Sequence, residues 1–216
     1  MSIELYSYWR SSASYRVRIA LNLKSLPYVT HGVNLTREGG DQWSVAYRDV
    51  NPQARVPTLV HNGQRFTQSL AIIEYLDETF PDHRLIPRDP VDRARVRMLS
   101  QIIACDIQPL QNTSTTLYLK EKLKLDEAAI TTWLQEWIVR GLGAFNAHLE
   151  RDQLSGKFCH GDTPTMADSC LVPQLYAASR FGIEVTRYPR LALIAENCAA
   201  MSAFQHAHPS KQPDAS

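Results

Sequence analysis

Short apolar runs alternate with helical patterns over residues 1–80. Helices are expected over residues 14–24 and 69–80, where apolar side chains recur three and four positions apart and a proline follows each end. Strands are expected over residues 3–8, 28–33, 58–61 and 65–67, and a short, weakly patterned helix between residues 38 and 50. The last two strands flank Asn62–Gly63, a dipeptide that favours a tight hairpin turn. The order β-α-β-α-β-β-α predicts a mixed four-stranded sheet with helices on its faces.

A different pattern follows residues 81–90, PDHRLIPRDP, whose three prolines and charges are typical of a linker. No strand pattern occurs beyond it, and helices are expected over residues 92–119, 126–149, 165–180 and 188–200. Pro109 should bend the first of these. Thr165 and Asp168 have the spacing of a capping box, so we interpret Asp168 as a structural residue rather than a catalytic acid. The polar residues 209–216 are expected to be loose.

Composition narrows the classes of function. The chain has 216 residues and a net charge of +1, which gives no reason to expect nucleic acid or an anionic membrane as a partner. Its four cysteines are widely spaced, without a C-x-x-C motif, and no metal site is expected. With no signal pattern and no long apolar run, the reducing cytoplasm is the expected compartment.

Polar side chains gather where the first strand meets its helix, in the segment YWRSSASYRVRIAL (residues 8–21). Sites in open α/β sheets lie at the carboxyl ends of strands, and a helix start favours negative charge. Ser11 and Ser12 therefore either cap the helix only or donate to an anion such as the thiolate of a ligand. A serine nucleophile is disfavoured, because no G-x-S-x-G elbow or nearby histidine accompanies it. Arg10 is a candidate for binding a substrate carboxylate, whereas Arg16 and Arg18 are expected to be scaffold that faces solvent or pairs with acidic residues.

Two more features suit a ligand with a carboxylate and an extended backbone. Gln68 and Ser69 stand at a second strand-to-helix junction, where free N–H groups and the Ser69 hydroxyl could hold a carboxylate, although Ser69 is a helix cap on either interpretation. Val56–Pro57 opens the third strand. A cis bond there would present the Val56 backbone to an extended ligand, while an ordinary trans edge proline is the alternative.

With these features in place, the sequence closely resembles the zeta class of soluble glutathione transferases, the maleylacetoacetate isomerases, along essentially its whole length. The segments that carry the resemblance are YWRSSASYRVRIALNLK (8–24), NPQARVPTL (51–59), QSLAIIEYL (68–76), RLIPRDPVDRARVR (84–97), IQPLQN (107–112), GDTPTMADSCLVPQ (161–174) and AFQHAHPSKQPD (203–214).

The resemblance implies a thioredoxin-like, glutathione-binding domain over residues 1–82 and an all-helical, substrate-binding domain over residues 90–216. It also implies a cis Val56–Pro57 bond, a homodimer, and glutathione as the cofactor for a small dicarboxylate substrate. By position, Ser11 and Ser12 would hold the sulfur, Val56 the cysteinyl backbone, Gln68 and Ser69 the γ-glutamyl carboxylate, and Gln42 the glycyl end. Gln108, Asn112 and Ser114 would line the cleft and contact the glutathione, and Arg10 and Arg180 would hold substrate carboxylates.

The implied reaction is the conversion of maleylacetoacetate to fumarylacetoacetate in tyrosine and phenylalanine catabolism, by thiolate addition, rotation and elimination. The chain departs from the family at Ala13, where a cysteine is common; a catalytic cysteine is excluded there. A maleylpyruvate isomerase is the nearest alternative, although that branch tends to have more histidine and arginine where this chain has Gln108, Asn112, Thr113 and Ser114. A general glutathione transferase, a haloacid-dehalogenating enzyme and a non-catalytic binding protein are further alternatives.

Overall fold

The computed structural model describes residues 2–215, and the chain divides into two compact units. The first unit comprises Met1–Ile86 together with Ala199–Ser216, and the second comprises Pro87–Cys198. The expected boundaries, 1–82 and 90–216, differ from these units chiefly at the C-terminus. The segment that follows residue 198 belongs to the unit that contains the sheet rather than to the helical unit.

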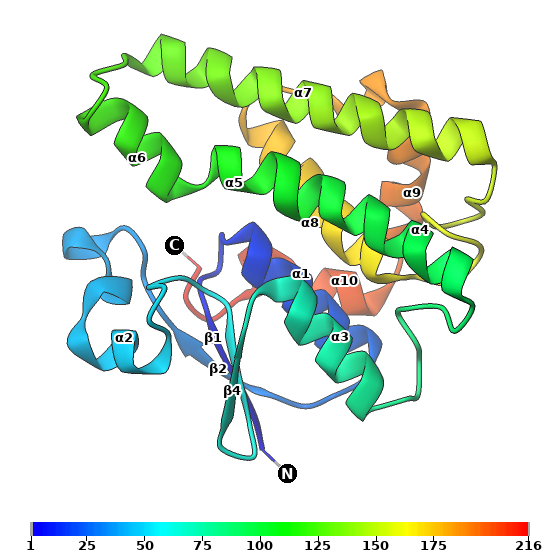
Figure 1. Ribbon diagram of the computed structural model, residues 1–216, viewed down its shortest axis with the longest axis horizontal. Coiled ribbons are helices and arrows are strands. Elements are labelled where there is room, and N and C mark those ends of the chain that lie inside the picture. Colours follow the sequence, from blue (N-terminus) through cyan, green and yellow to red (C-terminus); the bar gives the residue numbers. More distant parts are fainter. Residues whose placement is uncertain (1, 216) are drawn as a thin grey trace. The chain divides into compact units, whose positions relative to one another are not determined.

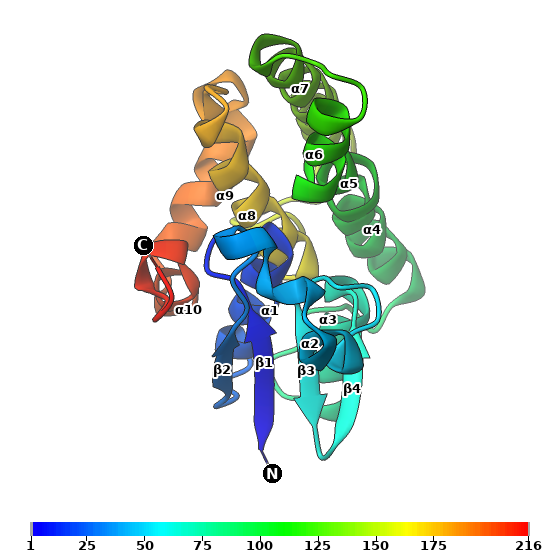
Figure 2. The same ribbon diagram turned by 90° about the vertical axis from the view of Figure 1, so that its left-hand side faces the viewer.

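A four-stranded sheet in the order β2-β1-β3-β4 organises the first unit (Figure 2). Its strands are β1 (Ile3–Ser7), β2 (Val29–Gly32), β3 (Thr58–His61) and β4 (Gln64–Thr67). β1 runs parallel to β2 and antiparallel to β3, and the β3–β4 hairpin turns at Asn62 and Gly63, both with positive φ. The predicted order of elements and the mixed sheet are therefore confirmed.

Helices cover both faces of this sheet. α1 (Ser12–Leu23) and α3 (Ser69–Thr79) lie together on one face, and α2 (Val45–Val50) lies on the other (Figure 1). Successive strand residues point to opposite faces. On the α2 face, the Tyr6 ring contacts the Tyr47 ring at 5.9 Å between centroids. The expected helices over 14–24 and 69–80 are confirmed to within a few residues, and the expected helix between 38 and 50 forms only at its end, after two short 3-10 turns.

A buried ion pair closes the end of the first unit. Lys24 Nζ lies 3.1 Å from Asp77 Oδ1 and donates also to the carbonyl of Asp82, at 2.9 Å. The same carboxylate accepts from the backbone N–H of Leu85 at 2.7 Å. The two charged side chains are at most 1% exposed to solvent. Their polar contacts within the protein therefore replace the hydrogen bonds that they would make to water. The pair thereby ties the ends of α1 and α3 to the segment that leaves the unit.

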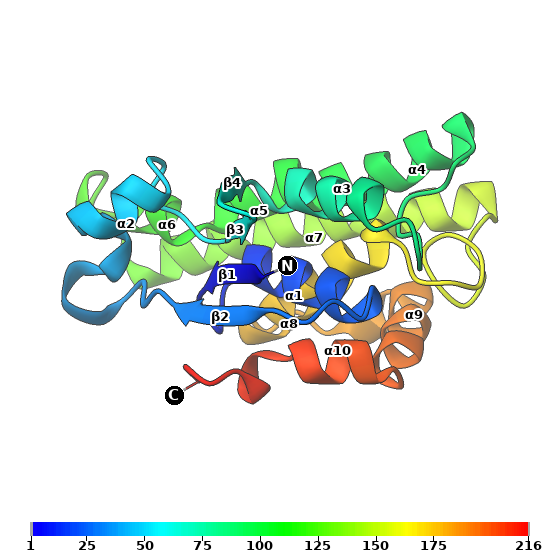
Figure 3. The ribbon, with the colours of Figure 1, turned by 90° about the horizontal axis from the view of Figure 1, so that it is seen from below.

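The C-terminal segment is held, contrary to the expectation of a loose tail. α10 (Ser202–Ala207) packs against α1, where Asn22 Nδ2 donates to the carbonyl of Ala203 at 3.0 Å. A 3-10 turn, Pro209–Lys211, follows, and Asp214 reaches the end of β2 at Gly32. Figures 2 and 3 show this segment, drawn in red, running alongside β2. The buried side chains of Phe204 and Ala207 hold it there, together with polar contacts such as that of Asn22.

The regular elements of the second unit are all helices among its described residues, as expected, apart from one isolated bridge between Ser155 and Gly161. Its elements are α4 (Pro90–Gln101), a π-helix (Ile102–Ile107), α5 (Gln108–Gln111), α6 (Thr113–Glu121), α7 (Glu127–Asp152), α8 (Met166–Arg180), a 3-10 turn (Val185–Arg187) and α9 (Pro189–Ala199). The capping box at Thr165 is confirmed: the Asp168 carboxylate accepts from the Thr165 N–H at 2.8 Å, and the Thr165 hydroxyl accepts from the first turn. No helix in residues 2–215 combines the length and apolar character needed to cross a membrane.

The expected long helix over 92–119 is interrupted more thoroughly than a single bend at Pro109. The backbone widens into the π-helix before that proline and breaks again at Asn112, the N-cap of α6. Proline cannot donate an N–H to the preceding turn, which favours an irregularity on its N-terminal side. Gly141 of α7 accommodates the irregularity, because any Cβ there would collide with the Ile107 side chain.

Candidate active site

The junction between β1 and α1 holds the two serines singled out by the sequence. Ser11 is the N-cap of α1, with extended backbone, and its Oγ accepts from the N–H of Ser14 at 3.2 Å. Ser12 is the first residue of the helix, and both serines are half-buried. A hydroxyl that accepts at its oxygen still has its own proton to donate. Ser11 therefore caps the helix and remains available to an anion at the helix start.

Neighbouring residues shape the same junction. Ser14 is fully buried, and its Oγ makes no hydrogen bond with any described residue. Arg10 is half-buried, and its guanidinium lies over the Trp9 ring, 5.2 Å from the centroid. Stacking of this kind leaves the edge of the guanidinium able to donate. Ala13 is half-buried on the first turn, so no protein thiol is present at this position.

Arg18 does not face solvent, which was one of the two placements expected for it. It is fully buried, and its guanidinium donates to the Ser7 hydroxyl at 3.0 Å and to the Trp9 carbonyl at 2.9 Å. Burial lowers the pKa of Arg18 to about 10, opposed by nearby Tyr28, Tyr15 and Asp214. The side chain still carries its charge near neutral pH, and it ties α1 to the end of β1.

The second junction places Ser69 and Gln68 at the start of α3. Ser69 is buried, and its Oγ accepts from Arg16 Nη1 at 3.1 Å. Gln68 precedes the helix with φ of +68°, a left-handed conformation that is costly for any residue with a side chain. Its exposed amide donates to the Gln53 amide oxygen at 2.9 Å. Sterically disfavoured backbone of this kind clusters at functional sites.

Arg16, which was expected to be a scaffold residue, contacts the second junction. It is 2% exposed, and its contact with Ser69 joins the second turn of α1 to the first residue of α3. The two helix starts in this unit are thereby coupled through a buried positive charge. Such a charge, next to free N–H groups, favours a bound anion at the α3 start.

Val56 and Gln42 lie in the loops beside this region. The Val56–Pro57 bond is cis, as the resemblance implied, and the sheet pairing of β3 begins after it, at Thr58. Gln42 lies in a 3-10 turn, and its side chain folds back over Gly40, where a Cβ would collide with it. Its Nε2 donates to the Leu35 carbonyl at 3.3 Å, and its Oε1 is buried without a partner among the described residues.

The remaining expected site residues belong to the second unit. Gln108 is half-buried at the start of α5, directly after the π-helix. Asn112 caps α6: its Oδ1 accepts from the N–H and the hydroxyl of Ser114, at 3.0 and 2.9 Å. Arg180 is exposed at the end of α8, with its guanidinium 5.8 Å from the centroid of the Phe181 ring. Asn112 and Ser114 thus have a structural task as well, with the Asn112 amide nitrogen left for other contacts.

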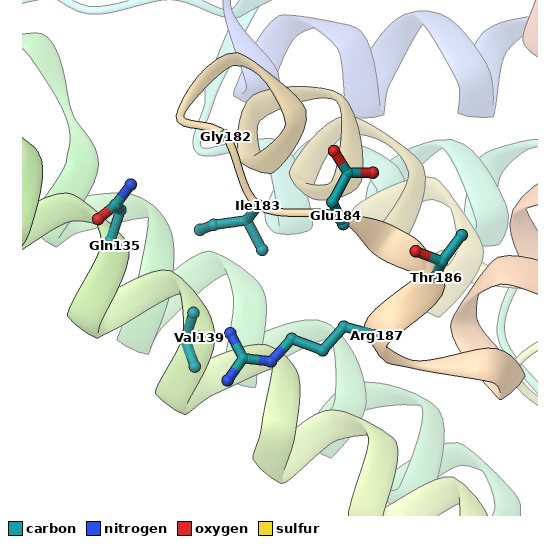
Figure 4. A pocket seen from close by; sticks show the side chains of 7 residues that line it. All are labelled: Gln135, Val139, Gly182, Ile183, Glu184, Thr186 and Arg187. Carbon is teal, nitrogen blue, oxygen red and sulfur yellow. The ribbon is translucent and has the colours of Figure 1, made fainter.

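A pocket of about 570 Å³ in the second unit contains none of the expected site residues. Figure 4 shows Gln135 and Val139 of α7 on one side and the connection from Gly182 to Arg187 on the other, with Arg187 extending toward Val139. Nothing in the sequence pattern pointed to it, and we assign it no part in the site.

The cysteines are not suited to supply a nucleophile. Cys159, Cys170 and Cys198 are buried and form no disulfide, and burial raises the pKa of Cys159 and of Cys198 well above the usual range. Only a thiolate is an effective nucleophile, and raised pKa values make these thiols inert near neutral pH. Cys105, on the π-helix, is exposed. The β1–α1 junction can instead stabilise a thiolate that arrives with a ligand.

Comparison with known proteins agrees with this geometry. Residues 5–84 match the family model "Glutathione S-transferase, N-terminal domain". Maleylacetoacetate isomerase of Pseudomonas aeruginosa is 46% identical over 215 residues, covering 98% of each chain. A holo structure of a bacterial maleyl pyruvate isomerase, described as a zeta-class glutathione S-transferase, superposes with a TM-score of 0.95 at 43% identity, covering 99% of this chain and 100% of that one. Maleylacetoacetate isomerase from Methylobacterium extorquens, with bound malonate and glutathione, superposes with a TM-score of 0.94 at 37% identity, covering 99% of both. The chain therefore belongs to the glutathione S-transferase family, in the zeta class that contains the maleylacetoacetate and maleylpyruvate isomerases.

Proposed function

We propose that this protein is a glutathione-dependent cis–trans isomerase that converts maleylacetoacetate to fumarylacetoacetate. The observation that carries the proposal is the pair of serine-bearing helix starts within one unit. Ser11 caps α1 and can still donate its hydroxyl proton. Ser69 is the first residue of α3, and its hydroxyl accepts a hydrogen bond from the buried Arg16. One start suits a thiolate and the other a carboxylate, which are the two anionic ends of the γ-glutamyl-cysteinyl part of glutathione.

The donor set fits glutathione. Ser11 and Ser12 would hold its sulfur, and Ser69 and the N–H groups at the start of α3 would hold its γ-glutamyl carboxylate, with Gln68 beside them. Val56, whose backbone lies outside the sheet pairing, would hold the cysteinyl backbone. When bound, glutathione supplies a thiolate that adds reversibly to the double bond of the substrate and so permits rotation. The nucleophilic sulfur is proposed to come from the ligand, because burial raises the pKa of Cys159 and of Cys198 and disfavours their thiolates.

The chain's own residues have two tasks in this reaction. The first is to favour the thiolate over the thiol, through the α1 start and the hydroxyl of Ser11 or Ser12; each unit by which the thiol pKa falls corresponds to about 1.4 kcal/mol. The second is to anchor the substrate, for which we propose the guanidinium groups of Arg10 and Arg180, since arginine binds carboxylates in a bidentate manner. Gln108 and Asn112 are proposed to line the cleft. Fixed anchors reduce the entropic cost of reaching a reactive geometry.

Maleylpyruvate is the second candidate substrate. Identity to the relatives does not separate the two: 46% to a maleylacetoacetate isomerase and 43% to a maleyl pyruvate isomerase. Maleylacetoacetate is the favoured substrate, because the residues proposed to line the cleft are uncharged: Gln108, Asn112, Thr113 and Ser114. Maleylpyruvate is shorter and carries its charges closer together, so it would favour histidine and arginine at these positions. The bound malonate of the Methylobacterium relative supports a dicarboxylate substrate in either case.

A competitive assay tests the proposal. Purified protein is given maleylacetoacetate or maleylpyruvate, with and without glutathione, and the trans product is followed by a coupled hydrolase. We expect turnover only with glutathione and a higher kcat/KM for maleylacetoacetate. Turnover without glutathione would refute the mechanism, and a higher kcat/KM for maleylpyruvate would reassign the substrate. An absence of both isomerisations, with conjugation or dehalogenation present, would favour a general transferase.

We further propose that the protein is a homodimer and acts in the cytoplasm. Its four cysteines form no disulfide, which agrees with a reducing compartment. Multi-angle light scattering should give twice the mass of the 24.5 kDa chain, and a monomeric mass would refute the dimer.

A further inference from the structure

The backbone of the β1–α1 turn is held by two charged side chains from outside the turn. Arg18 donates to the Trp9 carbonyl at 2.9 Å and to the Tyr8 carbonyl at 3.4 Å. The N–H of Trp9 donates to Asp214 Oδ2 at 2.9 Å. This turn leads directly into Ser11, whose own N–H donates to the Tyr8 carbonyl at 3.0 Å. The polar groups on both sides of Trp9 are therefore satisfied by Arg18 and Asp214 rather than by the sheet.

Both charged residues connect the turn to the C-terminal segment. Arg18 Nε donates to the carbonyl of Ala207, the last residue of α10, at 3.1 Å. Asp214 follows seven residues later and packs against Gly32, where an added Cβ would lie 3.6 Å from that of Asp214. Asp214 also lies near enough to Arg18 to favour its charged form. The segment AFQHAHPSKQPD, which the resemblance singled out without a task, ends at this aspartate.

The position of the Ser11 hydroxyl depends on this arrangement. A hydrogen bond to a thiolate weakens steeply with misalignment, and a turn whose N–H and C=O groups lack partners is free to shift. We propose that Asp214 is a positioning residue for the glutathione site: by accepting from the Trp9 N–H it fixes the turn that aims Ser11 at the thiolate. This inference rests on the proposed function, because it assumes that glutathione binds at the α1 start.

Three substitutions at Asp214 separate geometry from charge. D214N keeps an oxygen near the Trp9 N–H and removes the charge, D214E keeps the charge and moves the carboxylate by one methylene, and D214A removes both. We expect D214A and D214E to raise the pKa of the bound glutathione thiol by about one unit, a tenfold loss of thiolate below that pKa. D214N should stay close to the unaltered protein. Thiolate absorbance of the enzyme–glutathione complex, titrated against pH, gives these values.

The opposite pattern would overturn the inference. If only the charge of Asp214 mattered, D214A and D214N would both lower the thiol pKa, since a nearby negative charge disfavours a thiolate, and D214E would leave it unchanged. Equal pKa values in all variants would likewise refute the positioning role. Because Asp214 is half-buried and outside the apolar core, all three variants are expected to fold, and D214E perturbs the chain least.

Asn22→Ala supplies the matched control. Asn22 ties α1 to α10 through the Ala203 carbonyl but contacts nothing in the turn. Asn22→Ala should lower the thermal stability of the protein and leave the pKa of the bound glutathione thiol unchanged. A raised thiol pKa in this variant would show that any loosening of α10 disturbs the site, and it would refute a specific role for Asp214. Amide exchange at Trp9, faster in D214A than in D214N, reports the hydrogen bond without glutathione. Failure of the unaltered protein to bind glutathione would refute the proposed function, whereas binding with unmoved pKa values refutes this inference alone.

Discussion

Alanine substitutions at Ser11 and Ser12 should have different effects, because only one of these serines is a helix cap. Ser11 Oγ accepts from the Ser14 N–H, whereas Ser12 already lies inside α1. That bond also fixes the Ser11 oxygen at the helix start and uses only a lone pair, so the hydroxyl proton can still be donated to a ligand there. We therefore expect Ser11 to be the main donor to the glutathione thiolate.

The magnitude follows from the two bonds that Ser11→Ala removes. Loss of an N-cap costs about 1 kcal/mol, and the 3.2 Å separation is at the long end of the hydrogen-bond range, so we expect about 0.5–1 kcal/mol. Loss of a hydroxyl donor to a charged acceptor costs about 1.5–3 kcal/mol, which corresponds to a rise of about 1–2 units in the thiol pKa. Ser12→Ala should change stability by less than about 0.5 kcal/mol, the usual size of effect for substitutions that break no specific contact, and should move the thiol pKa less than Ser11→Ala does.

Two measurements check this expectation. Urea unfolding of the free protein gives the loss of the cap, and the pH titration of thiolate absorbance in the glutathione complex gives the loss of the donor. A pKa that rises in Ser12→Ala and not in Ser11→Ala would reassign the donor to Ser12. Unchanged pKa values in both variants would refute a hydroxyl donor altogether and leave the helix start alone to stabilise the thiolate.

Three further substitutions test other parts of the first and second units. Asp77→Asn removes the charge that balances the buried Lys24 and should cost about 3 kcal/mol in urea unfolding, because breaking a buried pair leaves one charge uncompensated; a cost below about 1 kcal/mol would contradict this. Asp168→Asn puts an amide donor against N–H groups that the carboxylate accepts from, and should cost about 2 kcal/mol with the glutathione thiol pKa unmoved, whereas a moved pKa would argue for a role beyond capping. Arg16→Met removes the guanidinium that donates to Ser69 and should weaken glutathione binding about tenfold by calorimetry, because the buried positive charge beside the α3 start is lost; unchanged affinity would remove Arg16 from the site.

Local patterns were sufficient to predict most of the fold. Apolar spacing and the Asn62–Gly63 turn predicted the order of strands and helices in the sheet unit, and the capping box predicted the start of α8. These features depend on residues that are neighbours in sequence, so a single sequence contains them. The boundaries shifted by one or two residues, for example at β1, which ends at Ser7 rather than Tyr8. End residues depend on hydrogen bonds to the next element, which periodicity does not specify.

The buried arginines could not be predicted in this way. Arg16 and Arg18 lie on a helix whose apolar positions suggested that its basic residues face outward, and arginine is rarely buried without partners. Their partners are Ser69, 53 residues away in sequence, and the Ala207 carbonyl, 189 residues away. For the same reason the sequence did not reveal that Asp214 holds the turn before Ser11. The resemblance predicted which residues belong to the site, but it did not predict the contacts that fix their positions.

The distribution of sulfur in the chain agrees with a reaction that depends on a ligand's thiolate. Residue 13, in the first turn of α1, is alanine and not cysteine, and the pKa values of Cys159 and Cys198 are raised by burial. A protein thiolate next to a bound glutathione could be drawn into thiol–disulfide exchange, which proceeds through a mixed disulfide and would occupy the site. A helix start with hydroxyl donors and no thiol stabilises the ligand's thiolate without offering it a sulfur partner. The same α1 start that lowers a thiol pKa would activate a cysteine placed there, so alanine at this position confines the effect to the ligand.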